Sequence, residues 1–322
     1  MSQLFRLLFL GLLLNWSVGS TAQVIKVTLL GTGNPQPSVE RFGPSTLVEV
    51  NGQYFVFDGG RGLSQRLWQK KIPLGQVNRL FLTHLHSDHI VGIPDFWLTG
   101  WLPANFGKRS TSLQVWGPQG TTEMMHFLQK AYAWDIKTRL GEKNKADSGI
   151  TVMAKDIEEG IVYDQAGVKI TAFTVDHADF IKGALGYRLD YAGRSVVISG
   201  DTRYSENLIK FAKGADVLIH EVAVARPELI KKSQTARQIL SFHTSPEDAG
   251  RVFAKVNPRL AVYHHIALVS TDAGIPAPTI SDIIPKTRLF FKGPIEVGDD
   301  LMTIEISDKI VVSRFADDKD KY

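Results

Sequence analysis

The chain has 322 residues, of which 43% are hydrophobic and 22% charged, as in an ordinary soluble globular protein with an ample core. Its 37 Lys and Arg residues exceed its 33 Asp and Glu residues only mildly, and no Lys/Arg block marks a nucleic-acid footprint. Because the chain has no cysteine, disulfide bonds and thiolate ligands are excluded, and any bound zinc must be held by nitrogen and oxygen alone.

The N-terminus has the pattern of a secretory signal peptide. Arg6 precedes an apolar run at 7–14, and the small residues Ser20 and Ala22 suit cleavage before Gln23. A membrane anchor is the competing interpretation, but the apolar run is too short to span a bilayer. We therefore expect a signal peptide at 1–22, a single domain at 23–322, and an exported protein that is periplasmic or secreted.

Beyond the N-terminus, short apolar runs alternate with hairpin and helix signals. The expected strands are 24–28, 47–50, 54–57, 80–83, 113–116, 151–155, 168–175, 185–190, 195–199, 217–220, 260–263, 302–306 and 309–312. The expected helices are 63–70, 89–98 with a kink or restart near Pro94, 119–134, and one that begins at Pro246. Asn51-Gly52 marks a tight hairpin, and Ser245 is the expected N-cap of the last helix. This order predicts an α/β (α+β) fold of two mixed sheets sandwiched by helices.

The most informative segment is His84-Leu85-His86-Ser87-Asp88-His89. It places three imidazoles and a carboxylate in one short stretch, directly after the apolar run at 80–82. Imidazole nitrogen and carboxylate oxygen are the ligands that zinc and its neighbours prefer. The segment therefore predicts a metal site in the loop that leaves a buried strand.

Further ligands are expected from later in the chain, because one segment cannot complete a metal centre. His177, Asp201 and His265 each follow a β-rich apolar run, and such positions gather at one edge of a sheet. Taken alone, His177 reads equally as a strand-end surface residue, and Asp201 as a turn-forming aspartate between Gly200 and Thr202. His264 stands beside His265 as the alternative for the last ligand.

In order and spacing, these residues resemble those of the metallo-β-lactamase superfamily, and within it the ribonuclease Z and arylsulfatase-like branch. The resemblance covers roughly residues 24–307 and would give the chain the four-layer αββα fold of that superfamily. Other segments that carry the resemblance are 29–33, 43–46, 116–118, 186–188, 200–202, 220–223 and 243–245.

The resemblance implies a pair of metal ions. His84, His86 and His177 would hold one ion, Asp88, His89 and His265 the other, and Asp201 would bridge them. A carboxylate can span two ions about 3.5–4 Å apart, and a water held between them loses a proton near neutral pH. The ions are expected to be two Zn²⁺, although Mn²⁺ and Fe²⁺ are compatible with the same nitrogen and oxygen ligands.

The resemblance also assigns catalytic roles. Asp88 would orient the attacking hydroxide as well as bind metal. His243 would protonate the leaving group, oriented by Glu221, a pairing that suits general-acid catalysis. A capping or supporting role for His243 is the alternative. His220 is expected to be a supporting or core residue.

The expected substrate is a small phosphodiester or sulfate ester, and nucleic acid is considered an improbable partner. In tRNA-processing ribonuclease Z a long arm separates the segments that match 186–188 and 200–202, whereas here only residues 189–200 lie between them. Export also argues against tRNA as the substrate, because tRNA is processed inside the cell. Aromatic residues near Trp101 are candidates for an apolar wall, and Arg41 and Arg203 for neutralising an anion. The alternative functions are a lactone or β-lactam hydrolase and a non-catalytic metal-binding protein. No stable membrane anchor is expected. The sequence leaves open whether the protein forms a homodimer.

Overall fold

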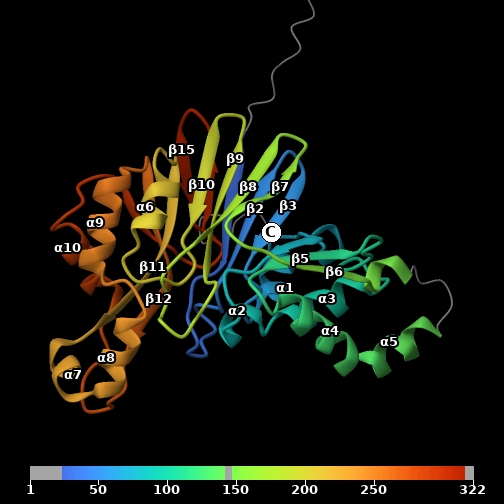
Figure 1. The fold of residues 1–322 in the computed structure, drawn as a ribbon, viewed down its shortest axis with the longest axis horizontal. Helices are drawn as coiled ribbons and strands as arrows, with labels where there is room; N and C mark the ends of the chain where they lie inside the picture. The colour runs from blue at the N-terminus through green and yellow to red at the C-terminus, as the bar shows by residue number, and fades with distance from the viewer. Residues whose placement is uncertain (1–23, 142–146, 316–322) are drawn as a thin grey trace, which may run out of the picture.

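The computed structural model describes residues 24–141 and 147–315, arranged as two stacked β-sheets with helices on the outer faces (Figure 1). The signal peptide expected at 1–22 lies outside the described residues. Among the described residues the first sheet has eight strands, in the order β15 (Ile310–Ser313), β14 (Thr303–Ile306), β1 (Ile25–Gly31), β2 (Ser45–Val50), β3 (Gln53–Phe57), β4 (Arg79–Phe81), β5 (Leu113–Gly117) and β6 (Val152–Asp156).

The second sheet has seven strands within the same described ranges. Their order is β13 (Ile295–Val297), β12 (Leu260–Val269), β11 (Val217–Ala225), β10 (Arg194–Ile198), β9 (Leu185–Tyr191), β8 (Val168–Thr174) and β7 (Gly160–Gln165). Both sheets are mixed, since β3 to β6 run parallel in one and β10 to β13 in the other, while the remaining neighbours are antiparallel.

Helices cover the outer face of each sheet. Those packed on the first sheet's side are α1 (Leu63–Gln69), α2 (Ser87–Ile90), α3 (Ile93–Trp101), α4 (Thr121–Ala131) and α5 (Ala133–Leu140). Those on the second sheet's side are α6 (Glu206–Ala212), α9 (Pro246–Val256) and α10 (Ile284–Thr287), and short 3₁₀ turns occupy Leu74–Gln76, Asp147–Ile150 and Ile280–Asp282. The helix pair α7 (Pro227–Lys232) and α8 (Gln234–Ser241) continues from β11 and lies apart from the others in Figure 1.

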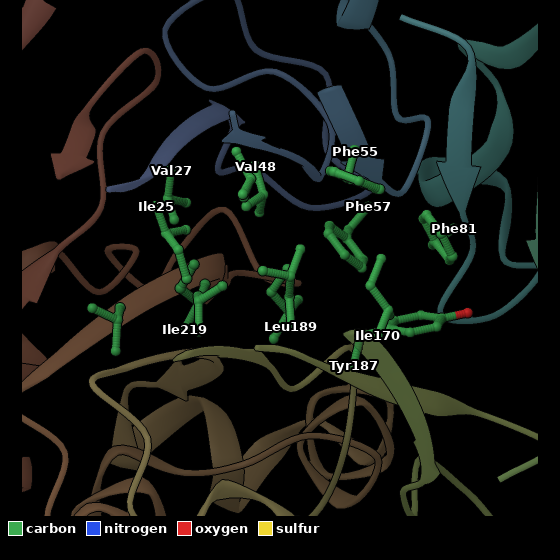
Figure 2. Close-up of a cluster of buried hydrophobic side chains, with 14 of the residues drawn as sticks. Ile25, Val27, Val48, Phe55, Phe57, Phe81, Ile170, Tyr187, Leu189 and Ile219 are labelled. Carbon is green, nitrogen blue, oxygen red and sulfur yellow. The ribbon is translucent and has the colours of Figure 1, made fainter. Parts of the chain in front are cut away.

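The alternation of side chains along each strand explains the layers. Phe55 and Phe57 of β3 point into the core between the sheets, whereas Val56 points to the core beneath the helices. Figure 2 shows Val48 and Phe57 of the first sheet facing Leu189 and Tyr187 of the second. The expected four-layer αββα arrangement is therefore confirmed, with one core between the sheets and one under each helical layer.

Most expected elements are present, and the differences have local reasons. The helix expected at 89–98 is split into α2 and α3, with Pro94 in the first turn of α3. Strands β11 and β12 run five and six residues beyond the ends expected at 220 and 263, because buried polar residues interrupt their apolar runs. Over the described residues, no helix combines the length and apolar character needed to cross a membrane.

Candidate metal centre

The seven candidate ligands converge in space, although they come from the segments that follow β4, β8 and β10, from α2, and from the middle of β12. His84, His86 and His177 form the first group, with His84 Nε2 2.9 Å and His177 Nε2 3.2 Å from His86 Nδ1. His84 and His86 follow β4, whereas His177 follows β8 of the other sheet. The two sheets therefore contribute to the same group of nitrogen atoms.

A second group contains Asp88, His89 and His265. The Oδ2 atom of Asp88 lies 3.5 Å from His89 Nε2 and 3.3 Å from His265 Nε2. The short helix α2 presents Asp88 and His89, and β12 presents His265. All three side chains are buried.

Asp201 lies between the two groups. Its Oδ1 atom is 3.4 Å from His89 Nε2, and its Oδ2 atom is 3.2 Å from His265 Nε2. The same Oδ2 atom is 3.9 Å from His84 Nε2 and 3.8 Å from His177 Nε2. One carboxylate is thus within 4 Å of nitrogen atoms from both groups.

The backbone before Asp201 requires glycine. Gly200 has φ +61°, and a Cβ atom there would lie 2.5 Å from the carbonyl oxygen of Leu185. Both the left-handed conformation and the close approach exclude other residues. Gly200 therefore turns the chain sharply at the end of β10, which places Asp201 over the sheet edge.

A β-bulge distinguishes His265 from its neighbour His264. Glu221 of β11 pairs with His264 and Val222 with Ile266, so His265 is the extra residue, with φ +44°. His265 consequently points at Asp88 and Asp201, whereas His264 Nε2 lies 3.4 Å from Thr46 Oγ1. Burial lowers the pKa of His264 to about 3, in keeping with a neutral imidazole away from the two groups.

The imidazoles are oriented through their far nitrogen atoms. His177 Nδ1 donates to the Phe242 carbonyl at 2.9 Å, and His89 Nδ1 donates to Asp58 Oδ2 at 2.8 Å. Asp58 also accepts from the backbone N–H and the hydroxyl of Thr83, at 2.8 and 2.9 Å. Sequence reasoning missed this supporting role of Asp58, although the Asp58-Gly59-Gly60 run directly after a strand was the available signal.

The electrostatics distinguish the first group of imidazoles, which burial keeps neutral, from His89, which lies between two carboxylates. Burial lowers the pKa of His84, His86 and His177, which keeps their ring nitrogen lone pairs free. Burial would raise the pKa of Asp201, but the imidazoles of His265 and His89 hold it well below its usual value. Burial likewise opposes the charged form of His89, yet the carboxylates of Asp201 and Asp58 raise its pKa well above the ordinary value.

Two buried atoms at the centre of the cluster show how well these residues fit a divalent metal. His89 Nε2 and Asp201 Oδ1 are buried and lack a hydrogen-bond partner within the described structure. A buried polar atom without a partner is costly, and these two face one another among other ligand-type atoms. Nitrogen and oxygen donors in this arrangement suit a pair of borderline or hard cations.

His243 and Glu221 form a contact beside the cluster. His243 Nδ1 is 3.2 Å from Glu221 Oε1, which also accepts from the backbone N–H groups of Thr202 and Thr244. Burial opposes protonation of His243, but the Glu221 carboxylate outweighs it and raises the His243 pKa to about 9. His220 is buried and bonds to the Glu221 carbonyl, outside the two ligand groups.

A cavity of about 290 Å³ opens onto the cluster. The residues that line it include six from the cluster and its surroundings, namely His86, Asp88, His177, Asp201, His243 and His265. Its apolar wall comes from the end of α8 and from β12, namely Ile239, Phe242, Ala267, Leu268 and Val269. The expected wall near Trp101 is not found, because that ring is packed in the core beneath α3. Arg41 pairs with Asp299, and Arg203 pairs with Asp176 and Asp179, so neither lines this cavity.

Comparisons with known proteins place this fold and site in a family. Residues 54–266 match the model of the beta-lactamase superfamily domain. A ribonuclease Z of Mycolicibacterium gilvum is 34% identical over 292 residues, which cover 88% of this chain and 96% of that protein. The chain therefore belongs to the metallo-β-lactamase superfamily, in its ribonuclease Z branch, and is a hydrolase of a fold that implies divalent metals.

Solved structures agree on the fold. The metallo-β-lactamase fold protein YhfI from Bacillus subtilis superposes with a TM-score of 0.67 at 17% identity, covering 88% of this chain and all of that one. The human tRNase Z, short form, superposes with a TM-score of 0.60 at 22% identity, covering 87% of this chain and 98% of that one. These two structures support the fold, while the family model and the ribonuclease Z relative confirm the expected family and branch.

These relatives contradict the expectation of a small-molecule ester substrate without nucleic acid. That expectation depended on the short segment at 189–200, which forms only the β9–β10 hairpin. Yet the Mycolicibacterium gilvum protein, named ribonuclease Z, is 34% identical to this chain and aligns over 96% of its own length. The short hairpin is therefore no argument against a nucleic-acid substrate, and the expectation was wrong.

Proposed function

We propose that this protein is a metal-dependent ribonuclease that hydrolyses a phosphodiester bond of RNA. The single observation that carries the proposal is the position of Asp201, within 4 Å of nitrogen atoms from both ligand groups at the base of an open cavity. The similarity to proteins named ribonuclease Z supports RNA as the substrate class. Precursor tRNA is the first RNA to test, given the fold shared with a tRNase Z.

The residues fit a pair of divalent ions, for which we propose Zn²⁺. One ion would be held by His84, His86 and His177, and the other by Asp88, His89 and His265. Asp201 would contribute to both ions. When bound, two such ions supply Lewis acidity to the phosphate and lower the pKa of a water molecule.

The protein's own side chains would handle orientation and proton transfer. Asp88 lines the cavity beside His265, where its carboxylate accepts a hydrogen bond from an attacking water and fixes its direction. His243 also lines the cavity and is held through Nδ1 by Glu221, which leaves Nε2 to give a proton to the leaving oxygen. General-acid catalysis of this kind contributes about 10²–10⁴-fold.

The surface around the cavity supports a polyanionic substrate. We call residues 226–242, which contain α7 and α8, the α7–α8 wall, because Ile239 and Phe242 of this segment line the cavity. The segment carries four basic residues (Arg226, Lys231, Lys232 and Arg237) and one acidic residue (Glu228), a formal charge of 4 − 1 = +3. Asp282, outside the segment, pairs with Arg226 at 2.7 Å and offsets one of the positive charges. Basic side chains beside a cavity attract the phosphate backbone of RNA.

The experiment is a cleavage assay on precursor tRNA and on an unstructured RNA, with the protein stripped by a chelator and then supplied with Zn²⁺, Mn²⁺ or Fe²⁺. We expect cleavage that depends on added metal and that Asp201→Ala abolishes. If a protein shown by elemental analysis to be metal-loaded leaves both RNAs intact, the proposal is wrong.

We further propose that the protein is exported, with residues 1–22 removed, and so meets RNA outside the cytoplasm. The observation behind this is the charged, apolar and small-residue pattern that ends at Ala22. N-terminal sequencing of the protein recovered from fractionated cells should begin at Gln23 in the exported fraction. An uncleaved protein confined to the cytoplasmic fraction would contradict it.

A further inference from the structure

We propose that Phe180 and Phe242 form a stacking subsite for the nucleobase next to the scissile phosphate. The inference rests on the proposed RNA hydrolysis and adds a substrate feature to it: an unpaired base beside the bond that is cut. The inference rests on two observations: Phe242 lies in the cavity wall, and the exposed ring of Phe180 packs against it.

Phe242 connects the subsite to the metal centre. Its side chain lines the cavity, and its carbonyl oxygen accepts the hydrogen bond from His177 Nδ1. The ring centroids of Phe242 and His177 are 6.5 Å apart. A group that contacts the Phe242 ring is therefore a neighbour of whatever is bound at the ligand groups, as a base is of its own phosphate.

Phe180 extends this aromatic surface to the outside. Its side chain is 68% exposed, and its ring packs edge-on against Phe242 with centroids 5.2 Å apart at 86°. Because the Phe180 ring is exposed next to a residue of the cavity wall, it offers apolar surface that a ligand in the cavity can cover. The two perpendicular rings form an aromatic corner, with Phe242 in the cavity wall and Phe180 exposed to solvent.

The segment around Phe180 is held in place on both sides. Ile181 N donates to the Ala178 carbonyl at 3.0 Å, and the Arg203 guanidinium bridges the carboxylates of Asp176 and Asp179 at 2.6 and 2.8 Å. Arg203, which sequence reasoning had considered as an anion ligand, thus fixes this turn. The ring is presented by a tethered segment, so little ordering is needed when a base stacks on it.

A nucleobase is the ligand chemistry that fits this surface. Every base offers a flat π-face, and stacking on an aromatic side chain tolerates any sequence. The wall next to the rings is apolar, with Ile239 and Leu268 lining the cavity, so it suits the face of a base. A base that is paired within a duplex cannot stack there, which predicts a preference for an unpaired nucleotide at the cleavage site.

The test uses single-stranded RNA oligonucleotides that carry either a base or an abasic ribose at each nucleotide flanking the cleaved bond in turn. At one of these positions we expect the abasic change to lower kcat/KM of the wild type by about tenfold, within the range for loss of one stacked base. Phe180→Ala should show the same loss on intact RNA and little response to the abasic change. Phe180→Tyr, which keeps a flat ring, should behave like the wild type.

Phe127→Ala on α4 is the matched control, because that ring is also exposed, at 60%, and does not line the cavity. It should leave kcat/KM unchanged. Equal abasic sensitivity in wild type and Phe180→Ala would overturn the stacking subsite while leaving RNA hydrolysis intact. A metal-loaded wild type that cleaves none of the oligonucleotides or tRNA would overturn both.

Discussion

At the scale of single residues, two candidate ligand histidines are oriented by hydrogen bonds from the ring nitrogen that faces away from the cluster. Asp58 is the clearest case, because its carboxylate fixes both His89 Nδ1 and Thr83. Such supporting groups set the ring orientation and the basicity of a metal-binding histidine. Their replacement therefore weakens metal binding even though they do not contact the metal.

Asp58→Asn should accordingly lower metal affinity by about 10–100-fold, because the amide removes the charge that supports His89. The measurement is a competition titration against a chromophoric chelator. Asp164→Asn, at an exposed position of β7, is the control and should bind metal like the wild type. Unchanged affinity in Asp58→Asn would show that His89 does not need this support.

His243→Ala should lower kcat on RNA by about 10²–10⁴-fold while the metal content stays the same, because the proposed loss is of a proton donor. Elemental analysis is essential here, since His243 Nδ1 also lies 3.9 Å from Asp201 Oδ2 and could belong to the ligand set. Loss of metal would assign His243 to binding instead.

A substrate whose leaving oxygen is replaced by sulfur separates the two roles further, because a thiolate departs without a proton. His243→Ala should recover much of its rate on that RNA. A rate on ordinary RNA equal to that of the wild type would remove the general-acid assignment.

The candidate ligands could be predicted from the sequence because each follows an apolar run. The choice between His264 and His265 could not be made from strand alternation alone, because it depends on a bulge that re-aims one residue. The supporting role of Asp58 could not be predicted either, because a lone aspartate at a strand end usually forms a turn. Its partner His89 is 31 positions away, so the contact depends on the tertiary structure.

At the scale of elements, the lengths of β11 and β12, two strands that carry site residues, were underestimated from the sequence. Glu221 and His265 lie inside β11 and β12, where a buried polar residue looks like the end of a strand. Short elements such as β7, β13 and α10 were missed because they are held by tertiary packing more than by local pattern. The hairpin at Asn51-Gly52 and the Ser245 cap were predictable, since both depend on local geometry and both are observed.

The basic α7–α8 wall provides a prediction for an element. Lys231→Glu with Lys232→Glu should raise KM for RNA and flatten its dependence on salt, because fewer phosphate contacts release fewer counterions. The turnover number should stay within a factor of about two, as neither lysine lines the cavity. KM measured across a salt series checks the prediction.

The control is Lys169→Glu with Lys309→Glu, which makes the same change in charge. Lys169 lies at the start of β8, at the opposite end of that strand from His177, and Lys309 lies in the β14–β15 turn. If the two double variants change KM equally, the effect comes from the net charge of the protein, and the α7–α8 wall is not a specific RNA contact.

At the scale of the whole molecule, the candidate metal centre brings together residues from the two sheets. His84, His86, Asp88 and His89 follow β4 of the first sheet, while His177, Asp201 and His265 belong to the second. Unfolding separates these groups, so a metal that binds only the folded state stabilises the packing of one sheet on the other. The general fold was predictable from the order of strands and helices, whereas this closure across the sheets needed the tertiary structure.

Removal of metal should therefore lower the melting temperature of the protein. Metal at about 100 times its Kd stabilises the folded state by about 2.7 kcal/mol per site, which corresponds to about 5 °C for a domain of this size. Circular dichroism melts of chelator-treated protein, with and without added Zn²⁺, measure the shift. Asp201→Ala should melt at nearly the same temperature in both conditions, because it lacks the carboxylate that joins the two ligand groups. A wild type that releases its metal without any change in melting temperature would show that the sheets hold together independently of the ions.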